Sequence, residues 1–167
     1  GATLNFNHSG NVSVANAIGG AGDLNKLDTH NLTLTGVNSY TGATGTGTAG
    51  GVVYTNDTAP ATSGFTGSGT VTIEPATASF ASALGANYTY ATTLTGLTLG
   101  KAGNLTDMTV DSLVDIAGPI TLYAPHITLN NGNISTTGGQ TYNGAVILGA
   151  NTTLTSTASG GITFGST

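Results

Sequence analysis

The sequence predicts an all-β fold, a right-handed parallel β-helix of roughly eight coils. Thr, Gly and Asn number 33, 27 and 15 and together fill 75 of the 167 positions. Thr favours strands, whereas Gly and Asn favour turns, so this mixture indicates many short strands joined by tight corners. A short apolar–polar–apolar triplet also recurs along the chain, and frequent Gly disfavours helices. An antiparallel β-sandwich is the alternative fold.

The triplets consist of two apolar residues flanking one small polar residue. In a strand, alternate side chains point to opposite faces, so each triplet turns two apolar groups inward and one polar group outward. The eight copies are Leu4-Asn5-Phe6, Val12-Ser13-Val14, Leu32-Thr33-Leu34, Val71-Thr72-Ile73, Leu97-Thr98-Leu99, Ile120-Thr121-Leu122, Ile127-Thr128-Leu129 and Ile162-Thr163-Phe164.

The spacing of the triplets indicates a solenoid. Successive triplets begin 8, 20, 39, 26, 23, 7 and 35 residues apart. Steps of 7 or 8 suit neighbouring faces of one coil, steps of 20 to 26 suit one full coil, and longer steps cover more than one coil or an insertion. In such a fold each coil stacks on the next to build a shared core. At about 21 residues per coil and ~4.8 Å per coil, we expect a rod near 40 Å long.

Two stretches depart from the triplet pattern. Residues 40–69 are rich in Gly, Thr and Ala, with one strand candidate at Val52-Val53-Tyr54, and are predicted to form a loop or hairpin extruded from the coil. Residues 76–93 are rich in Ala, with Tyr88 and Tyr90 at strand spacing. We therefore expect a single domain, residues 1–167, with an excursion at 40–69.

The best helix candidate is residues 104–117. There Met108, Val110, Val114 and Ile116 all occupy even positions. Because this period is two and not 3.6, the segment is predicted to be extended as well.

Composition excludes several classes of function. Charged residues make up only 5%, with two Lys and no Arg, so the chain cannot neutralise many nucleic-acid phosphates or anionic lipids. No apolar run approaches the ~20 residues that span a bilayer. The chain contains no Cys, which excludes disulfides and thiolate metal sites. We expect a secreted or cell-surface segment of a larger exoprotein, with no nucleic-acid partner and no membrane insertion.

Several stretches resemble a known family. Residues 4–10 (LNFNHSG), 17–26 (AIGGAGDLNK), 32–36 (LTLTG) and 38–42 (NSYTG) resemble repeats of autotransporter passengers and filamentous-haemagglutinin-like exoproteins. Residues 138–146 (GGQTYNGAV) and 148–154 resemble repeats of two-partner-secretion adhesins. The chain departs from the family at Asp28-Thr29-His30, which replaces a Gly-rich turn, and it shows no secretion, translocator or toxin module.

The resemblance implies a β-helical fibre on, or released from, a Gram-negative bacterial surface. The expected function is a structural and display segment of an adhesin fibre that mediates surface attachment, biofilm contact or virulence. Its partners would be adjoining coils of the same parent chain and host or environmental glycans or proteins. The alternatives are a subunit of a polymerised extracellular fibre with a sandwich fold, and a β-helix that binds or cleaves polysaccharide.

The motifs that carry chemistry point to no enzyme, cofactor or metal. Residues 45–50 (GTGTAG) match a dinucleotide fingerprint but lack the helix that must follow it. Residues 19–23 (GGAGD) resemble a calcium-binding repeat that has no second copy. Three aspartates lie four residues apart, a spacing typical of a solvated face, and the three histidines lack metal-type spacing. These residues are Asp107, Asp111 and Asp115, and His8, His30 and His126.

Asparagines in Asn-x-Ser/Thr sequons are candidate glycosylation sites. Eight such sequons occur, and an Asn before an apolar-Thr pair also suits the coil pattern. The eight residues are Asn7, Asn11, Asn31, Asn56, Asn87, Asn104, Asn133 and Asn151.

Overall fold

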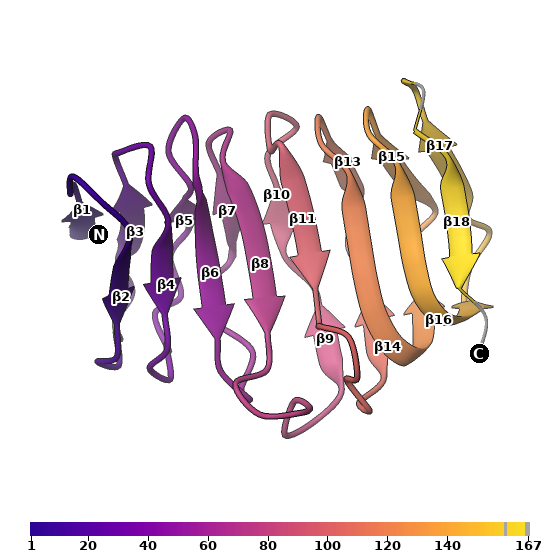
Figure 1. Ribbon diagram of the computed structural model, residues 1–167, viewed down its shortest axis with the longest axis horizontal. Helices are drawn as coiled ribbons and strands as arrows, with labels where there is room; N and C mark the ends of the chain where they lie inside the picture. Colours follow the sequence, from indigo (N-terminus) through magenta and orange to yellow (C-terminus); the bar gives the residue numbers. More distant parts are fainter. Residues whose placement is uncertain (159, 166–167) are drawn as a thin grey trace.

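The fold is a parallel β-solenoid of about eight turns (Figure 1). The computed structural model describes residues 1–158 and 160–165. Every strand pair among these residues is parallel, and they form strands, turns and bends without a helix. The predicted solenoid is therefore confirmed, and the antiparallel sandwich is wrong.

Three columns of strands form the faces of the solenoid. The longest column runs through β2 (Val12–Val14), β4 (Leu32–Leu34), β6 (Gly51–Thr55), β8 (Thr70–Glu74), β11 (Gly96–Leu99), β14 (Ile120–Leu129), β16 (Gln140–Leu148) and β18 (Ile162–Gly165). A second sheet contains β1 (Thr3–Phe6), β3 (Asp23–Lys26), β5 (Thr44–Gly45), β7 (Gly64–Thr66) and β10 (Thr89–Tyr90). A third contains β13 (Val114–Ile116), β15 (Asn133–Thr136) and β17 (Thr153–Ser156), and β10 packs against β13.

A further face begins midway along the solenoid. β9 (Leu84–Ala86) pairs with β12 (Met108–Val110), which pairs with the second half of β14. The coil from Val71 to Leu97 is longer than those before it because it includes this additional strand. The predicted extended segment at residues 104–117 is confirmed as β12 and β13.

The register between coils is close to 20 residues in the N-terminal part. Leu4 pairs with Leu24, Val12 with Leu32, and Leu32 with Val52. Inward positions of successive coils therefore lie directly over one another, and outward positions do the same.

All eight triplets lie in strands, and their apolar residues point into the solenoid. Leu32, Leu99 and Leu129 are fully buried. Leu4 in the first coil and Phe164 in the last remain 45% and 54% exposed, because no further coil covers them.

Residues 40–69 do not form the predicted excursion. They contain β5, β6 and β7, and β6 pairs with β4 on one side and β8 on the other. The inward side chains here are partly polar: buried Thr44 bonds to the Tyr40 hydroxyl at 2.6 Å and the Tyr54 hydroxyl at 2.8 Å. Because these hydroxyls satisfy one another, this stretch belongs to the core without an apolar triplet.

A second group of buried, hydrogen-bonded polar side chains lies in β16. Gln140 is fully buried, and its amide donates to the Ile134 carbonyl at 3.1 Å and the Thr155 carbonyl at 2.9 Å. The Tyr142 hydroxyl donates to Gln140 Oε1 at 2.8 Å. Gln140-Thr141-Tyr142 thus occupies a place where other coils carry an aliphatic triplet.

Candidate functional site

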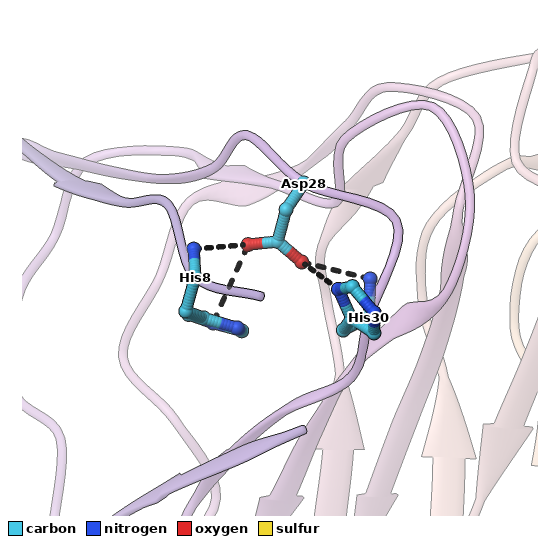
Figure 2. Close-up of side chains that lie close together, drawn as sticks. All are labelled: His8, Asp28 and His30. Atoms are coloured by element: carbon cyan, nitrogen blue, oxygen red, sulfur yellow. Dashed lines mark hydrogen bonds and ion pairs between the residues drawn. The ribbon is translucent and has the colours of Figure 1, made fainter. Parts of the chain in front are cut away.

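Three side chains that offer ligand atoms meet at the corner between the first two coils. His8 follows β1, and Asp28 and His30 lie between β3 and β4. Figure 2 shows the Asp28 carboxylate between the two imidazoles, which approach it from opposite sides. One ligand atom from each residue lies within 4.8 Å of the other two.

The solenoid register brings these residues together. Phe6 pairs with Lys26, so His8, two residues further on, lies over Asp28 in the next coil. Val12 pairs with Leu32 in the strands that follow the corner. The corner therefore contains one residue from the first coil and two from the second.

Backbone amides fix the Asp28 carboxylate. The His8 amide donates to Oδ2 at 3.2 Å, and the His30 amide donates to Oδ1 at 2.7 Å. Only 7% of the Asp28 side chain is exposed. Burial alone would raise the pKa of Asp28, but the amide bonds from His30 and His8 and the nearby charges of His8 and Lys26 outweigh it, so this pKa is lower than usual.

The imidazole of His8 is oriented by a backbone carbonyl. Its Nδ1 lies 2.5 Å from the Gly10 carbonyl oxygen, which can only accept, so Nδ1 carries the proton. In neutral His8 the lone pair is then on Nε2, which lies 3.4 Å from Asp28 Oδ2. His30 Nδ1 lies 3.5 Å from Asp28 Oδ1. Among the described residues, neither His8 Nε2 nor His30 Nδ1 has a hydrogen-bond partner, and both atoms are buried.

Lys26, the last residue of β3, lies next to the same corner. Its side chain is buried, and Nζ donates to the carbonyl of Asp28 at 2.6 Å and that of Ala49 at 2.7 Å. Burial lowers the pKa of Lys26, and the Asp28 charge opposes that change. The ammonium therefore links the second and third coils and leaves the carboxylate oxygens of Asp28 to the two histidines.

The arrangement suits binding of a cation or a proton. Two imidazole nitrogens and a carboxylate are donor atoms typical of borderline divalent metals. Within residues 1–158 and 160–165, neither imidazole hydrogen-bonds to a Ser or Thr hydroxyl, the contact that activates a nucleophile in hydrolases.

The predicted glycosylation residues differ in accessibility. Asn104 is buried, and its amide nitrogen donates to the carbonyls of Thr106 and Tyr123, both at 2.9 Å. A glycan would replace one of the two Nδ2 hydrogens and so remove at least one of these bonds. Asn56 is half-buried and donates to the Thr35 carbonyl at 3.0 Å. The other six are exposed: Asn7, Asn11, Asn31, Asn87, Asn133 and Asn151.

The other motifs form no additional cluster in the described residues. Asp107, Asp111 and Asp115 are exposed, as predicted for a solvated face. Asp107 Oδ1 lies 2.9 Å from Nδ1 of His126, which is also exposed. The glycine-rich residues 45–50 lead from β5 to β6 through a corner and have no helix after them.

Local sequence motifs do not predict the grouping of His8 with His30. Their separation of 22 residues fits no local metal motif. In the sequence, Asp28-Thr29-His30 differs from the resembled family only by replacing a Gly-rich turn. The coil period of about 20 residues would predict the cluster, because His8 and Asp28 are 20 residues apart.

The described residues form a parallel β-solenoid with a His-Asp-His corner. No family model, curated protein or solved structure matches this chain. Among the described residues, no helix is long and apolar enough to cross a membrane.

Proposed function

We propose that this chain is a structural and display segment of an extended bacterial surface adhesin, with further coils of the same parent chain stacked on its ends. The main support for the proposal is that the strands at both ends of the described solenoid have an unpaired edge. β1 and β2 have a strand neighbour on one side only, as do β17 and β18. Such edges leave one row of backbone groups free to pair with another strand.

The apolar interior also reaches both ends. Leu4 at one end and Phe164 at the other lie in inward rows, yet about half of each side chain is exposed. Solenoids usually cover their terminal repeats with polar caps. A further coil stacked on each end would continue the inward rows, bury these side chains and pair the free strand edges.

The surface suits display in an extracellular environment. Only 5% of the residues are charged, so hydroxyl and amide groups hydrate the faces. On the long face, Thr72, Thr98 and Thr121 follow one another at outward positions of successive strands. A regular face of this kind presents short polar side chains at ~4.8 Å intervals to a glycan or protein partner.

A tandem chain tests the stacking directly. Two copies joined by a spacer of about three residues would place Leu4 of the second copy about 20 residues after Leu154 of the first, and Val12 about 20 after Ile162. We expect the tandem to form one rod of about twice the length in small-angle X-ray scattering, with a higher melting temperature than the single copy. The matched control carries Leu4→Asp in the second copy, which should remove that gain.

Two results would argue against the proposal. A tandem that melts like the single chain and scatters as two hinged bodies would indicate that the ends do not accept another coil. Filaments formed by the single chain would instead indicate a solenoid subunit that polymerises. The display role is tested separately, by binding of chain-coated beads to glycan and matrix-protein surfaces, compared with uncoated beads.

A further inference from the structure

The corner formed by His8, Asp28 and His30 carries an inference beyond the proposed structural role. We propose that these residues bind one zinc ion, which joins the first coil to the second. The ligand atoms would be His8 Nε2, an oxygen of Asp28 and His30 Nδ1, the atoms that lie within 4.8 Å of one another.

The distances fit a tetrahedral metal better than direct hydrogen bonds. Charge-assisted N–H···O bonds measure about 2.7–2.9 Å, but the two imidazole nitrogens lie 3.4 and 3.5 Å from the Asp28 oxygens. Two ligand atoms that are each about 2.0–2.1 Å from a tetrahedral zinc ion lie about 3.3 Å apart. Each separation, His8 Nε2 to Oδ2 and His30 Nδ1 to Oδ1, is therefore close to an edge of a zinc coordination tetrahedron, and the three ligand atoms together lie within 4.8 Å of one another.

The two imidazole ligand atoms accept no hydrogen bond from the described residues, and the ring of His8 is already oriented. Nδ1–H of His8 donates to the Gly10 carbonyl, which directs the lone pair on Nε2 toward the cluster. Metal-binding histidines commonly donate their second ring nitrogen to a carbonyl in this way. His8 Nε2 and His30 Nδ1 are both buried without a hydrogen-bond partner in the part of the chain that the structure describes. A cation between them and the carboxylate would satisfy both atoms.

The donor set selects the class of metal. Calcium and magnesium prefer six or more oxygen ligands, and only one carboxylate is present here. Two imidazoles and one carboxylate suit zinc and other borderline divalent ions, with a fourth position left for water or another donor. The His30 side chain is 40% exposed, although its Nδ1 is buried.

The site joins the first two coils at the N-terminal end of the solenoid, where one face of the first coil is uncovered. His8 belongs to the first coil, whose Leu4 is 45% exposed, whereas Asp28 and His30 belong to the second. Zinc binding would therefore hold the first coil in place. The buried Lys26 ammonium beneath Asp28 opposes a second positive charge, so we expect weaker binding than at a four-ligand structural zinc site.

Titration of zinc into the tag-free, metal-free 167-residue chain by isothermal calorimetry tests the proposal. We expect one zinc ion per chain and no saturable binding of calcium or magnesium. His8→Gln removes a ligand, and Asp28→Asn removes the charge while keeping an oxygen for the backbone amides. Each should weaken zinc binding by at least about 10-fold. His126→Gln, which alters an exposed imidazole beside Asp107, should leave zinc binding unchanged.

A second measurement does not depend on how the variants fold. In the unaltered chain, zinc should shift the NMR signals of the His8 and His30 rings and slow amide exchange in β1, while the His126 ring stays unchanged. The proposal is overturned if no saturable binding occurs at millimolar zinc, or if only His126 responds. Binding that survives in a folded His8→Gln variant, or calcium binding in preference to zinc, would also overturn it.

Discussion

Leu99 and Leu105 are close in the sequence but differ in burial, because one points into the solenoid and the other does not. Leu99 is fully buried in β11, where it pairs with Ile73 and Leu122 on the two sides. Leu105 follows only six residues later and is 77% exposed in the connection between β11 and β12. The two positions therefore form a matched pair for testing which side chains hold the solenoid together.

Leu99→Asp should unfold the chain or destabilise it severely. Truncating a buried Leu costs about 2–5 kcal/mol, and a buried unpaired carboxylate adds a desolvation cost of similar or larger size. Leu105→Asp should change stability by less than about 0.5 kcal/mol, because its side chain already contacts water. Thermal melts followed by circular dichroism compare the two variants, and similar melting temperatures would show that the inward assignment is wrong.

At the scale of the element, corners are held by Asp and Asn side chains that reach the backbone of a neighbouring coil. Asp23 accepts from the Ala43 amide at 2.8 Å, and Asn38 accepts from the Ile18 amide at 3.1 Å. Asp57 accepts from both the amide and the hydroxyl of Thr77 at 2.8 Å. Each pair is separated by 20 residues, so these bonds tie one coil to the next in addition to the strand pairings.

The Asp57 corner predicts a pH dependence of stability. The amide and hydroxyl bonds from Thr77 lower the pKa of Asp57 despite the opposing effect of burial. A group whose folded pKa is depressed contributes stability above its unfolded pKa, about 3.9, and this contribution disappears as the pH falls through the folded pKa. We therefore expect Asp57→Asn to melt lower than the unaltered chain at about pH 6, with the gap closing below about pH 4.

Melting temperatures between about pH 2 and pH 7 measure this gap. Asp115→Asn is the control, because Asp115 is exposed in β13. A gap for Asp57→Asn that stays constant over the whole range would contradict the role given to the Thr77 bonds.

Elements with strict alternation could be predicted from the sequence. β4, β8 and β11 each place aliphatic residues at alternate positions, which only an extended chain can turn to one face. β5 and β16 could not be found in this way, because their inward positions hold Thr44 and Gln140. Those polar groups are acceptable inside the solenoid only because Tyr40 and Tyr142 bond to them, and such contacts depend on the folded register.

The candidate site was beyond the reach of local motifs for the same reason. Asp28 receives the amides of His8 and His30, and this depends on a register of 20 residues between coils. The triplet spacings alone obscured that register, since the step from Leu32 to Val71 passes over the coil that contains Val52. When Val52-Val53-Tyr54 is counted as one more strand of the long column, successive strands begin about 20 residues apart, and this period places His8 over Asp28.

At the scale of the whole molecule, the solenoid is a linear stack in which each coil contacts its neighbours (Figure 1). Its stability should then approximate the sum of single coils and the interfaces between them. The two ends lack one interface each, which is why the proposed further coils and the proposed zinc ion both act where the stack is weakest. Both proposals depend on parallel coils that lie in register.

Distances between spin labels test that register most directly. The chain has no Cys, so pairs of cysteines can be introduced and labelled without altering others. Ser13 is linked to Thr98 by four successive strand pairings on the long face, and to Thr141 by six. Thr33 and Thr121 are also four pairings apart.

Double electron–electron resonance on these three label pairs should give about 19 Å for Ser13–Thr98, the same value for Thr33–Thr121, and about 29 Å for Ser13–Thr141. Distances that rise in this way with the number of coils are what a parallel stack predicts. Unequal values for the two four-step pairs, or a Ser13–Thr141 distance no longer than Ser13–Thr98, would contradict it.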